Sequence, residues 1–231
     1  MIQENLILKQ VSSGIAPLSK HNIKILHEKG FIKGSIPTSC QNTASLWLIE
    51  QMNLLGKCIC YCQQPQVMHV RIIPNCDSTS LSLSDLRIFP HTDVAWQEKP
   101  PKFIGFFCLD PGNKEEYQTI SDSLKVIKSL PKNVLSVLTK DLVHFPSPKY
   151  VKTQGFSGKI IDNNNLRINY RNIRYAWSEE SELFFQELIN AEEILELRKG
   201  SFWFIDNKRY AHGRHKLSYD SPRHLLRCYG Q

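Results

Sequence analysis

The sequence has no long hydrophobic run: none of its apolar stretches approaches the roughly 18 residues that a membrane-spanning helix needs. Polar residues interrupt the first ten positions, which therefore lack the apolar core of a secretory signal peptide. We expect a cytoplasmic protein that does not bind membranes. Internal repeats and low-complexity linkers are missing as well, so the 231 residues fit one domain with a sizeable core.

Clustered basic residues are also missing. The formal net charge is +7, from 29 lysines and arginines against 22 acidic residues, but the basic residues are scattered along the chain. No basic run with interleaved aromatic residues, as in nucleic-acid-binding modules, is present. This distribution predicts a solvated basic surface, with a minor attraction for small anions, and argues against a nucleic-acid partner.

Cysteine is present in an odd number, seven, without a secretory signal, which favours free thiols over a disulfide framework. The densest group is Cys58, Cys60 and Cys62. Its spacing of two is the alternation of a β-strand and differs from the CxxC loops that hold zinc. We interpret these thiols as small residues along one face of a buried strand.

The order of patterns along the chain predicts a mainly β protein with flanking helices. Helices are expected at 18–29, ending at Gly30, and at 44–55, ending before Gly56. Helical inserts are expected at 120–140 and 179–197. Eight short apolar or alternating runs separated by turn residues lie at 58–62, 67–73, 86–90, 103–109, 159–161, 166–170, 201–205 and 223–229.

Eight such runs predict a double-sheet jelly roll, the cupin-like double-stranded β-helix. We therefore expect a single domain over residues 1–231. Residues 1–56 would form an N-terminal helical buttress, and residues 57–231 would form the jelly-roll core with its helical inserts.

Two short motifs far apart in the sequence carry the candidate chemistry. His91 and Asp93, at positions i and i+2 of a strand, project from one face and can bind one cation together, and His212 supplies a second imidazole. Two imidazoles and one carboxylate that leave other positions open are typical of non-haem Fe(II) oxygenases. A histidine on an apolar strand is, however, often a hydrogen-bonded core residue.

A second motif strengthens the interpretation as a metal site. Arg223 lies eleven residues after His212 (223 − 212), in a stretch that reads as a strand. Arginine binds a carboxylate through two parallel, charge-assisted hydrogen bonds. A metal site beside an arginine indicates a dicarboxylate co-substrate.

Three segments resemble a known family. HTDVAWQEKPP at 91–101, DNKRYAHGR at 206–214 and RHLLR at 223–227 are similar to the Fe(II)/2-oxoglutarate-dependent dioxygenases related to taurine dioxygenase, clavaminate synthase and gamma-butyrobetaine hydroxylase. The resemblance runs from about Gly56 to the C-terminus. The first fifty or so residues match only in their pattern of helices.

The resemblance implies a role for each motif residue. His91, Asp93 and His212 would bind Fe(II), and Arg223 would bind the distal carboxylate of 2-oxoglutarate. Arg227, about 13 Å further along an extended chain, would meet the carboxylate next to the metal, or the substrate.

Thr119 falls where such enzymes often place a hydroxyl that contacts 2-oxoglutarate. The stretch 119–122 also fits a helix-capping box, and the two interpretations stay open.

The reaction implied by the resemblance converts 2-oxoglutarate and O2 to succinate and CO2 while a C–H bond of the substrate is oxidised. The related halogenases lack the carboxylate ligand that Asp93 supplies here. Its presence therefore favours hydroxylation, or a variant such as desaturation or ring formation.

Candidates for the substrate side are fewer. Residues 166–171 alternate, so Arg167, Asn169 and Arg171 share a face. Asn169 and Arg171 stand where several relatives place acidic residues, which argues against a guanidinium-bearing substrate. Arg171 would pair with a carboxylated substrate if it faces inward and would be solvated surface if it faces outward. Gln64 and Trp96 could also line the cavity, although Trp96 could equally be packing.

The segment between Asp93 and His212 leaves little room for a long lid, so we expect a small, amino-acid-like metabolite or biosynthetic intermediate, free or bound to a carrier protein. Two other classes remain open. The same ligands suit a zinc hydrolase, which would not need Arg223, and a cupin-like binding protein could hold a metal without turnover.

Overall fold

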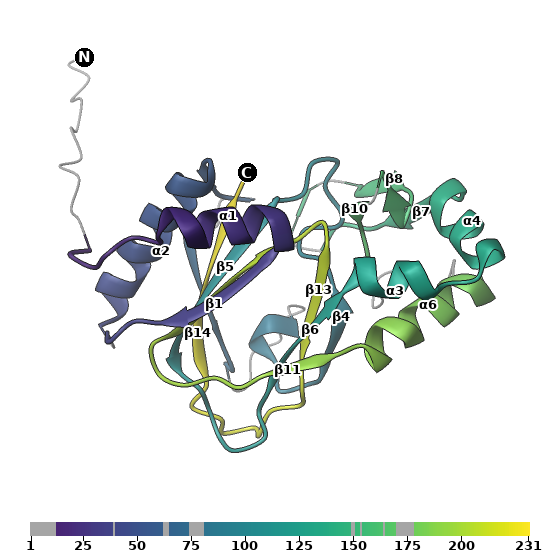
Figure 1. The fold of residues 1–231 in the computed structure, drawn as a ribbon. Helices are drawn as coiled ribbons and strands as arrows, with labels where there is room; N and C mark the ends of the chain where they lie inside the picture. The colour runs from purple at the N-terminus through teal and green to yellow at the C-terminus, as the bar shows by residue number, and fades with distance from the viewer. Residues whose placement is uncertain are drawn as a thin grey trace, which may run out of the picture.

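The structure, a computed structural model, describes residues 13–38, 40–61, 65–73, 81–148, 151–152, 154–163, 165–169 and 178–231. Two antiparallel sheets pack against each other, and helices cover their outer faces (Figure 1). This arrangement confirms the expected jelly roll with flanking helices. In the described part of the chain, no helix has both the length and the apolar content to cross a membrane.

The larger sheet has six strands in the order β1-β12-β5-β14-β2, with β3 also paired to β14. All of its pairings are antiparallel. Its strands are β1 (Phe31–Ser35), β2 (Cys58–Ile59), β3 (Val67–Arg71), β5 (Phe103–Asp110), β12 (Ser201–Asp206) and β14 (His224–Gly230).

The smaller sheet has four strands in the order β11-β6-β13-β4. They are β4 (Ile88–His91), β6 (Gln118–Asp122), β11 (Glu193–Leu195) and β13 (Tyr210–Arg214). Two short hairpins accompany the sheets: β7 (Val143–Phe145) with β8 (Phe156–Gly158), and β9 (Ile161–Asp162) with β10 (Asn165–Leu166). A 3-10 turn, η1, covers Leu81–Leu83.

The N-terminal helices α1 (Lys20–Lys29) and α2 (Gln41–Leu55) cover the outer face of the larger sheet (Figure 1). The α1 helix begins at a Ser19 cap and ends at Gly30, whose φ of 75° is the left-handed conformation that glycine adopts without strain. Trp47 of α2 is buried against Phe202 of the sheet. Both expected helices are therefore present. The segment 1–56 is nevertheless not purely helical, because β1 pairs with β12 at the sheet edge.

In the described part of the chain, the outer face of the smaller sheet is covered by α3 (Ser123–Ser129), α4 (Lys132–Lys140) and α6 (Glu179–Asn190). The helical insert expected over 120–140 begins instead with the end of β6. The insert expected over 179–197 ends early, because the chain continues into β11.

The space between the sheets is filled by a third group of buried side chains, including Phe106 and Trp203 from the larger sheet and Ile120 from the smaller one. The ring centroids of Phe106 and Trp203 lie 4.9 Å apart in a stacked geometry. Because strand side chains alternate, the inward residues of each strand form rows across this core.

The described cysteines have free thiols. Cys58 is buried in β2 with its Sγ 3.3 Å from that of Cys228. The expectation of three thiols on one buried strand face is wrong for Cys60, which is exposed because β2 ends at Ile59. Cys62 lies outside the described residues.

Candidate metal centre

His91 and His212 are cross-strand partners at the junction of β4 and β13. Their ring centroids lie 4.3 Å apart, and the edge of the Phe106 ring contacts His212 from the opposite sheet. The pairing of His212 with Ile120 of β6, which belongs to the core between the sheets, places both imidazoles on the inner face.

Asp93 reaches the histidines by a different route from the one expected. The sequence suggested two residues on one strand face, but β4 ends at His91 and Asp93 lies in the following turn. The next residue, Val94, has a φ of 59°, which is strained for a β-branched side chain. Asn207 holds the turn, because its Oδ1 accepts from the Asp93 backbone N at 2.8 Å and its Nδ2 donates to the Asp93 carbonyl at 3.0 Å.

The three side chains converge on one point. Their potential ligand atoms all lie within 4.8 Å of one another. Oδ1 of Asp93 lies 3.3 Å from Nε2 of His91 and 3.7 Å from Nε2 of His212. Neighbouring ligands about 2.1 Å from an octahedral metal are about 3.0 Å apart, so the three residues fit a first-row metal ion with small adjustments.

The protonation states suit metal binding as well. Burial alone would raise the pKa of the Asp93 carboxyl, but the charge of Arg227 and the two histidines outweigh it and hold that pKa far below its usual range. Burial, and then the neighbouring His91, lower the pKa of His212 to about 3, so the imidazole is neutral. Nδ1 of His91 lies 3.0 Å from the Phe89 carbonyl, a contact that leaves Nε2 to face the other ligands.

The second oxygen of Asp93 has its own partners. Oδ2 accepts hydrogen bonds from Nη1 of Arg227 at 3.0 Å and from the Tyr229 hydroxyl at 2.9 Å. Both donors lie on the inner face of β14. Arg227 is therefore bonded to the Asp93 side chain, and its expected contact with the co-substrate or the substrate stays a prediction.

Arg223 is a buried cation, with 2% of its surface exposed. Its guanidinium donates to the Glu116 carbonyl at 2.8 Å and to Oε1 of Gln118 at 2.7 Å. Among the described residues no carboxylate forms an ion pair with it. Burial lowers the pKa of Arg223 to about 10, so it stays charged at neutral pH. An unpaired buried guanidinium is costly, and an anionic ligand would offset that cost.

Gln118, which accepts a hydrogen bond from Arg223, lies on β6, the strand that pairs with the His212 strand. Gln118 stands two residues before Ile120, the cross-strand partner of His212. Two residues of an antiparallel strand span about 6.8 Å, which is of the order of the length of a five-carbon diacid. This spacing along β6 is compatible with a diacid bound between His212 and the Arg223–Gln118 contact.

Thr119 faces away from this space. It follows Gln118 in β6, so its side chain points to the outer face, where its hydroxyl donates to Oε1 of Glu192 at 2.8 Å. Neither expected role fits this position: the hydroxyl does not face the core, and the residue lies in a strand rather than in a capping box. Asp122 alone of that motif caps a helix, accepting from the backbone N of Leu124 in α3.

The candidate substrate residues are dispersed. Asn169 forms an isolated β-bridge with His91 and so lies beside the metal ligands. Trp96 is buried in the cluster beneath α4 and α6, where it acts as packing. Arg167 stabilises the turn after Asp93. Its guanidinium donates to the backbone carbonyls of Ala95, Gln97 and Glu98. Gln64 and Arg171 lie outside the described residues.

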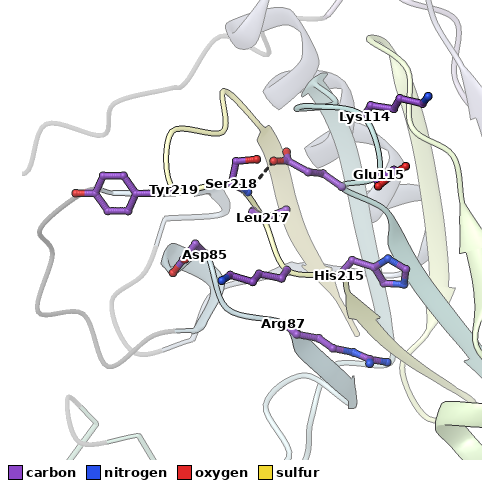
Figure 2. Close-up of a pocket in the computed structure, with 10 residues that line it drawn as sticks. Asp85, Arg87, Lys114, Glu115, His215, Leu217, Ser218 and Tyr219 are labelled. Carbon is purple, nitrogen blue, oxygen red and sulfur yellow. Dashed lines mark hydrogen bonds between the residues drawn. The ribbon is translucent and has the colours of Figure 1, made fainter.

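A pocket of about 700 Å³ has Glu116, whose backbone carbonyl accepts from Arg223, among its lining residues. Figure 2 shows it lined by side chains of both charge signs, and Ser218 donates from its backbone N to the Glu116 carboxylate at 2.8 Å. None of the metal-site residues lines this pocket, and its mixed charges point to no particular ligand.

The chain is similar to a family of dioxygenases and to solved oxygenase structures. A protein-family model described as "Taurine catabolism dioxygenase TauD, TfdA family" matches residues 63–229. A search of curated protein sequences gave no match.

Similar solved structures include an asparagine oxygenase in complex with Fe(II), 2S,3S-3-hydroxyasparagine and succinate, with a TM-score of 0.71 and 14% identity over 91% of this chain and 78% of that one. The non-heme iron oxygenase OrfP in complex with Fe and alpha-ketoglutaric acid gives a TM-score of 0.74 and 16% identity over 93% and 81%. OrfP with Fe, succinate and (3R,4R)-dihydroxy-L-Arg gives 0.73 and 15% over the same shares.

Proposed function

Because the chain belongs to the taurine catabolism dioxygenase TauD, TfdA family, we propose that it is an Fe(II)- and 2-oxoglutarate-dependent dioxygenase that hydroxylates a C–H bond of a small, amino-acid-like metabolite. Succinate and CO2 would be the co-products. The observation that carries this proposal is the convergence of two histidines and one aspartate on one point, together with the buried guanidinium of Arg223, which is bonded to Gln118 on the strand beside His212.

His91, Asp93 and His212 would hold the iron, which together with 2-oxoglutarate and O2 supplies the oxidation of an unactivated C–H bond. The chain's own contribution is to present a ligand set in its binding form. The carboxylate is ionised and His212 is neutral, so no proton has to leave these two groups before a metal binds.

Arg223 and Gln118 would hold the distal carboxylate of 2-oxoglutarate. Both side chains lie on the inner face, and their 2.7 Å hydrogen bond fixes the plane of the guanidinium. A carboxylate arriving there would replace water with two charge-assisted hydrogen bonds in a buried setting, where such bonds are strong. Gln118 takes the place that the sequence suggested for Thr119.

The substrate would lie on the Asn169 side of the metal. The bridge between Asn169 and His91 places this polar residue next to the site, where it can hydrogen-bond a polar ligand. The solved structures with hydroxylated asparagine and arginine support an amino-acid-like substrate for this chain. Gln64 and Arg171 stay candidates from the sequence.

The proposal is tested in two steps. Anaerobic Fe(II) with 2-oxoglutarate should give a weak visible charge-transfer band, which His91→Ala should abolish. The matched control is His144→Ala, because His144 is an exposed histidine on β7. A band that survives His91→Ala, or no band in the wild-type protein, would contradict the proposal.

The second step identifies the substrate. Free and carrier-bound amino acids are screened for stimulation of succinate release in the presence of O2, and the product mass is read. A gain of one oxygen supports hydroxylation, whereas a loss of two hydrogens would indicate desaturation or cyclisation. No succinate with any candidate would count against an amino-acid-like substrate.

A further inference from the structure

The two oxygens of Asp93 lie in different surroundings. Oδ1 faces the Nε2 atoms of His91 and His212, at 3.3 and 3.7 Å. Oδ2 points the other way and accepts from the Tyr229 hydroxyl and from Arg227. Only one of the two oxygens is therefore turned toward the metal position, and the other is occupied by two donors.

Tyr229 is held rigidly by the larger sheet. It is 3% exposed and pairs with Ile104 of β5 and Ile59 of β2 on its two sides. The edge of its ring meets Tyr61, with centroids 5.6 Å apart. A ring packed on several sides cannot swing, so the place of its hydroxyl follows from the register of β14.

Arg227 is a charged partner for the same oxygen. Its Nη2 lies 3.8 Å from the thioether sulfur of Met68, a weak acceptor, and its guanidinium carries a charge that an anionic ligand can attract. A neutral hydroxyl offers no such attraction. If Arg227 turns toward an anion, Tyr229 still holds Oδ2.

We propose that Tyr229 is a positioning residue that fixes Asp93 for metal binding through one oxygen only. The inference rests on the proposed function, because it concerns the same three ligands. With Oδ2 bound by Tyr229, the Asp93 carboxylate would offer a metal ion one oxygen instead of two. Such binding would leave room for a co-substrate and O2. Hydrogen-bond partners that orient metal ligands are typically worth 10–100-fold in metal affinity.

The test is a Co(II) titration of the metal-free protein, followed by visible absorption and calorimetry. Tyr229→Phe keeps the ring and removes only the hydroxyl, and we expect it to weaken Co(II) binding about tenfold. The matched control is Tyr61→Phe, because the Tyr61 hydroxyl donates to the Lys99 carbonyl and touches no metal ligand. Its affinity should stay within about twofold of wild type.

A double-mutant cycle separates positioning from general damage. In an Asp93→Ala background, removal of the Tyr229 hydroxyl should leave the residual Co(II) affinity unchanged, because the group acts through Asp93. Equal losses in both backgrounds would overturn the inference. Circular dichroism and the unfolding temperature of each metal-free variant check that the sheet is intact.

The two proposals fail in different ways. If wild-type protein binds Co(II) no better than His91→Ala, the metal site and with it the proposed function are wrong. If wild type binds Co(II) through His91 but Tyr229→Phe binds equally well, the inference about Tyr229 alone is wrong.

Discussion

His91 and His212 stand directly opposite each other on β4 and β13, and a glycine makes this approach possible. A Cβ atom on Gly213 would lie 2.5 Å from the Ile88 carbonyl oxygen and 3.0 Å from the Thr119 hydroxyl. The Ile88 carbonyl belongs to the backbone, so it cannot move aside for a new Cβ atom as the end of a flexible side chain can. The absence of a side chain at position 213 therefore keeps the two candidate metal ligands, His91 and His212, within reach of each other.

Gly213→Ala should push β4 away from β13. We expect Co(II) affinity to fall at least tenfold and the free energy of unfolding to drop by about 1–3 kcal/mol, the usual cost of overpacking. Gly34→Ala is the control, because the nearest atoms to its Cβ belong to the Phe202 ring, which packs under α1 and α2 in the larger sheet. The control should lose stability but keep its Co(II) affinity. Equal affinity in both variants would contradict the prediction.

Gln118 and Thr119 are adjacent in β6 but face opposite sides of the sheet. Gln118→Ala removes the 2.7 Å hydrogen bond to Arg223 and should raise the KM for 2-oxoglutarate about tenfold, equivalent to about 1.4 kcal/mol. Thr119→Ala should leave that KM within about twofold of wild type, because its hydroxyl bonds Glu192 on the other face. Steady-state succinate formation measures both. A larger effect from Thr119 would restore the assignment suggested by the sequence.

Asp122 forms an ion pair with Arg209. This ion pair should make the free energy of unfolding depend on pH. Burial alone would raise the pKa of Asp122, but the hydrogen bonds and charge of Arg209 outweigh it and lower that pKa. Nε and Nη2 of Arg209 lie 3.1 and 2.7 Å from the two carboxylate oxygens. A carboxyl whose pKa is lower in the folded state adds stability above its unfolded pKa of about 3.9. That stability is lost as the pH falls through the folded pKa.

Asp122→Asn should therefore cost about 1–3 kcal/mol at pH 7. The difference from wild type should begin to shrink below about pH 4. Urea unfolding at several pH values measures it. Glu193→Gln, which breaks an exposed pair with Lys125, should cause no measurable loss at any pH. A constant difference for Asp122→Asn down to pH 3 would exclude a charge-based origin.

Arg167 should matter for stability rather than for substrate binding. Its guanidinium donates to three backbone carbonyls and lies 4.3 Å from the centroid of the Phe156 ring. Arg167→Met should cost about 1–3 kcal/mol, and Arg167→Lys should not restore it, because an ammonium cannot reproduce the planar fork. Thermal unfolding and substrate KM are the measurements. A raised substrate KM with unchanged stability would place Arg167 in the substrate site instead.

Patterns of neighbouring residues predicted the layers of the fold well. Most of the apolar runs match strands, and Gly30 ends α1 as expected. The sequence missed β6 and β13, although both carry site residues. All five residues of each strand are buried, so polar side chains such as Gln118 and Arg214 point into the protein and break the alternation that identifies a half-buried strand.

Only the residues of the candidate site that belong to the sequence motifs could be predicted. The sequence proposed the two histidines and Asp93, which the structure brings together, and Arg223, whose carboxylate-binding role stays a prediction, because their residue types and spacing point to metal and carboxylate binding. Asn207 and Tyr229 contact Asp93 from positions 114 and 136 residues away. Such contacts depend on how the two sheets pack against each other, and the pattern of neighbouring residues in the sequence does not predict that packing.

One strand, β14, links the parts of this site. It follows directly after Arg223 and carries Arg227 and Tyr229 on its inner face, between β5 on one side and β2 and β3 on the other. Inserting or deleting a single residue between 223 and 229 would turn part of this set to the outer face. Evolution can therefore exchange side chains along β14 but can scarcely alter its length, and loops elsewhere are the natural places for the chain to grow or shrink.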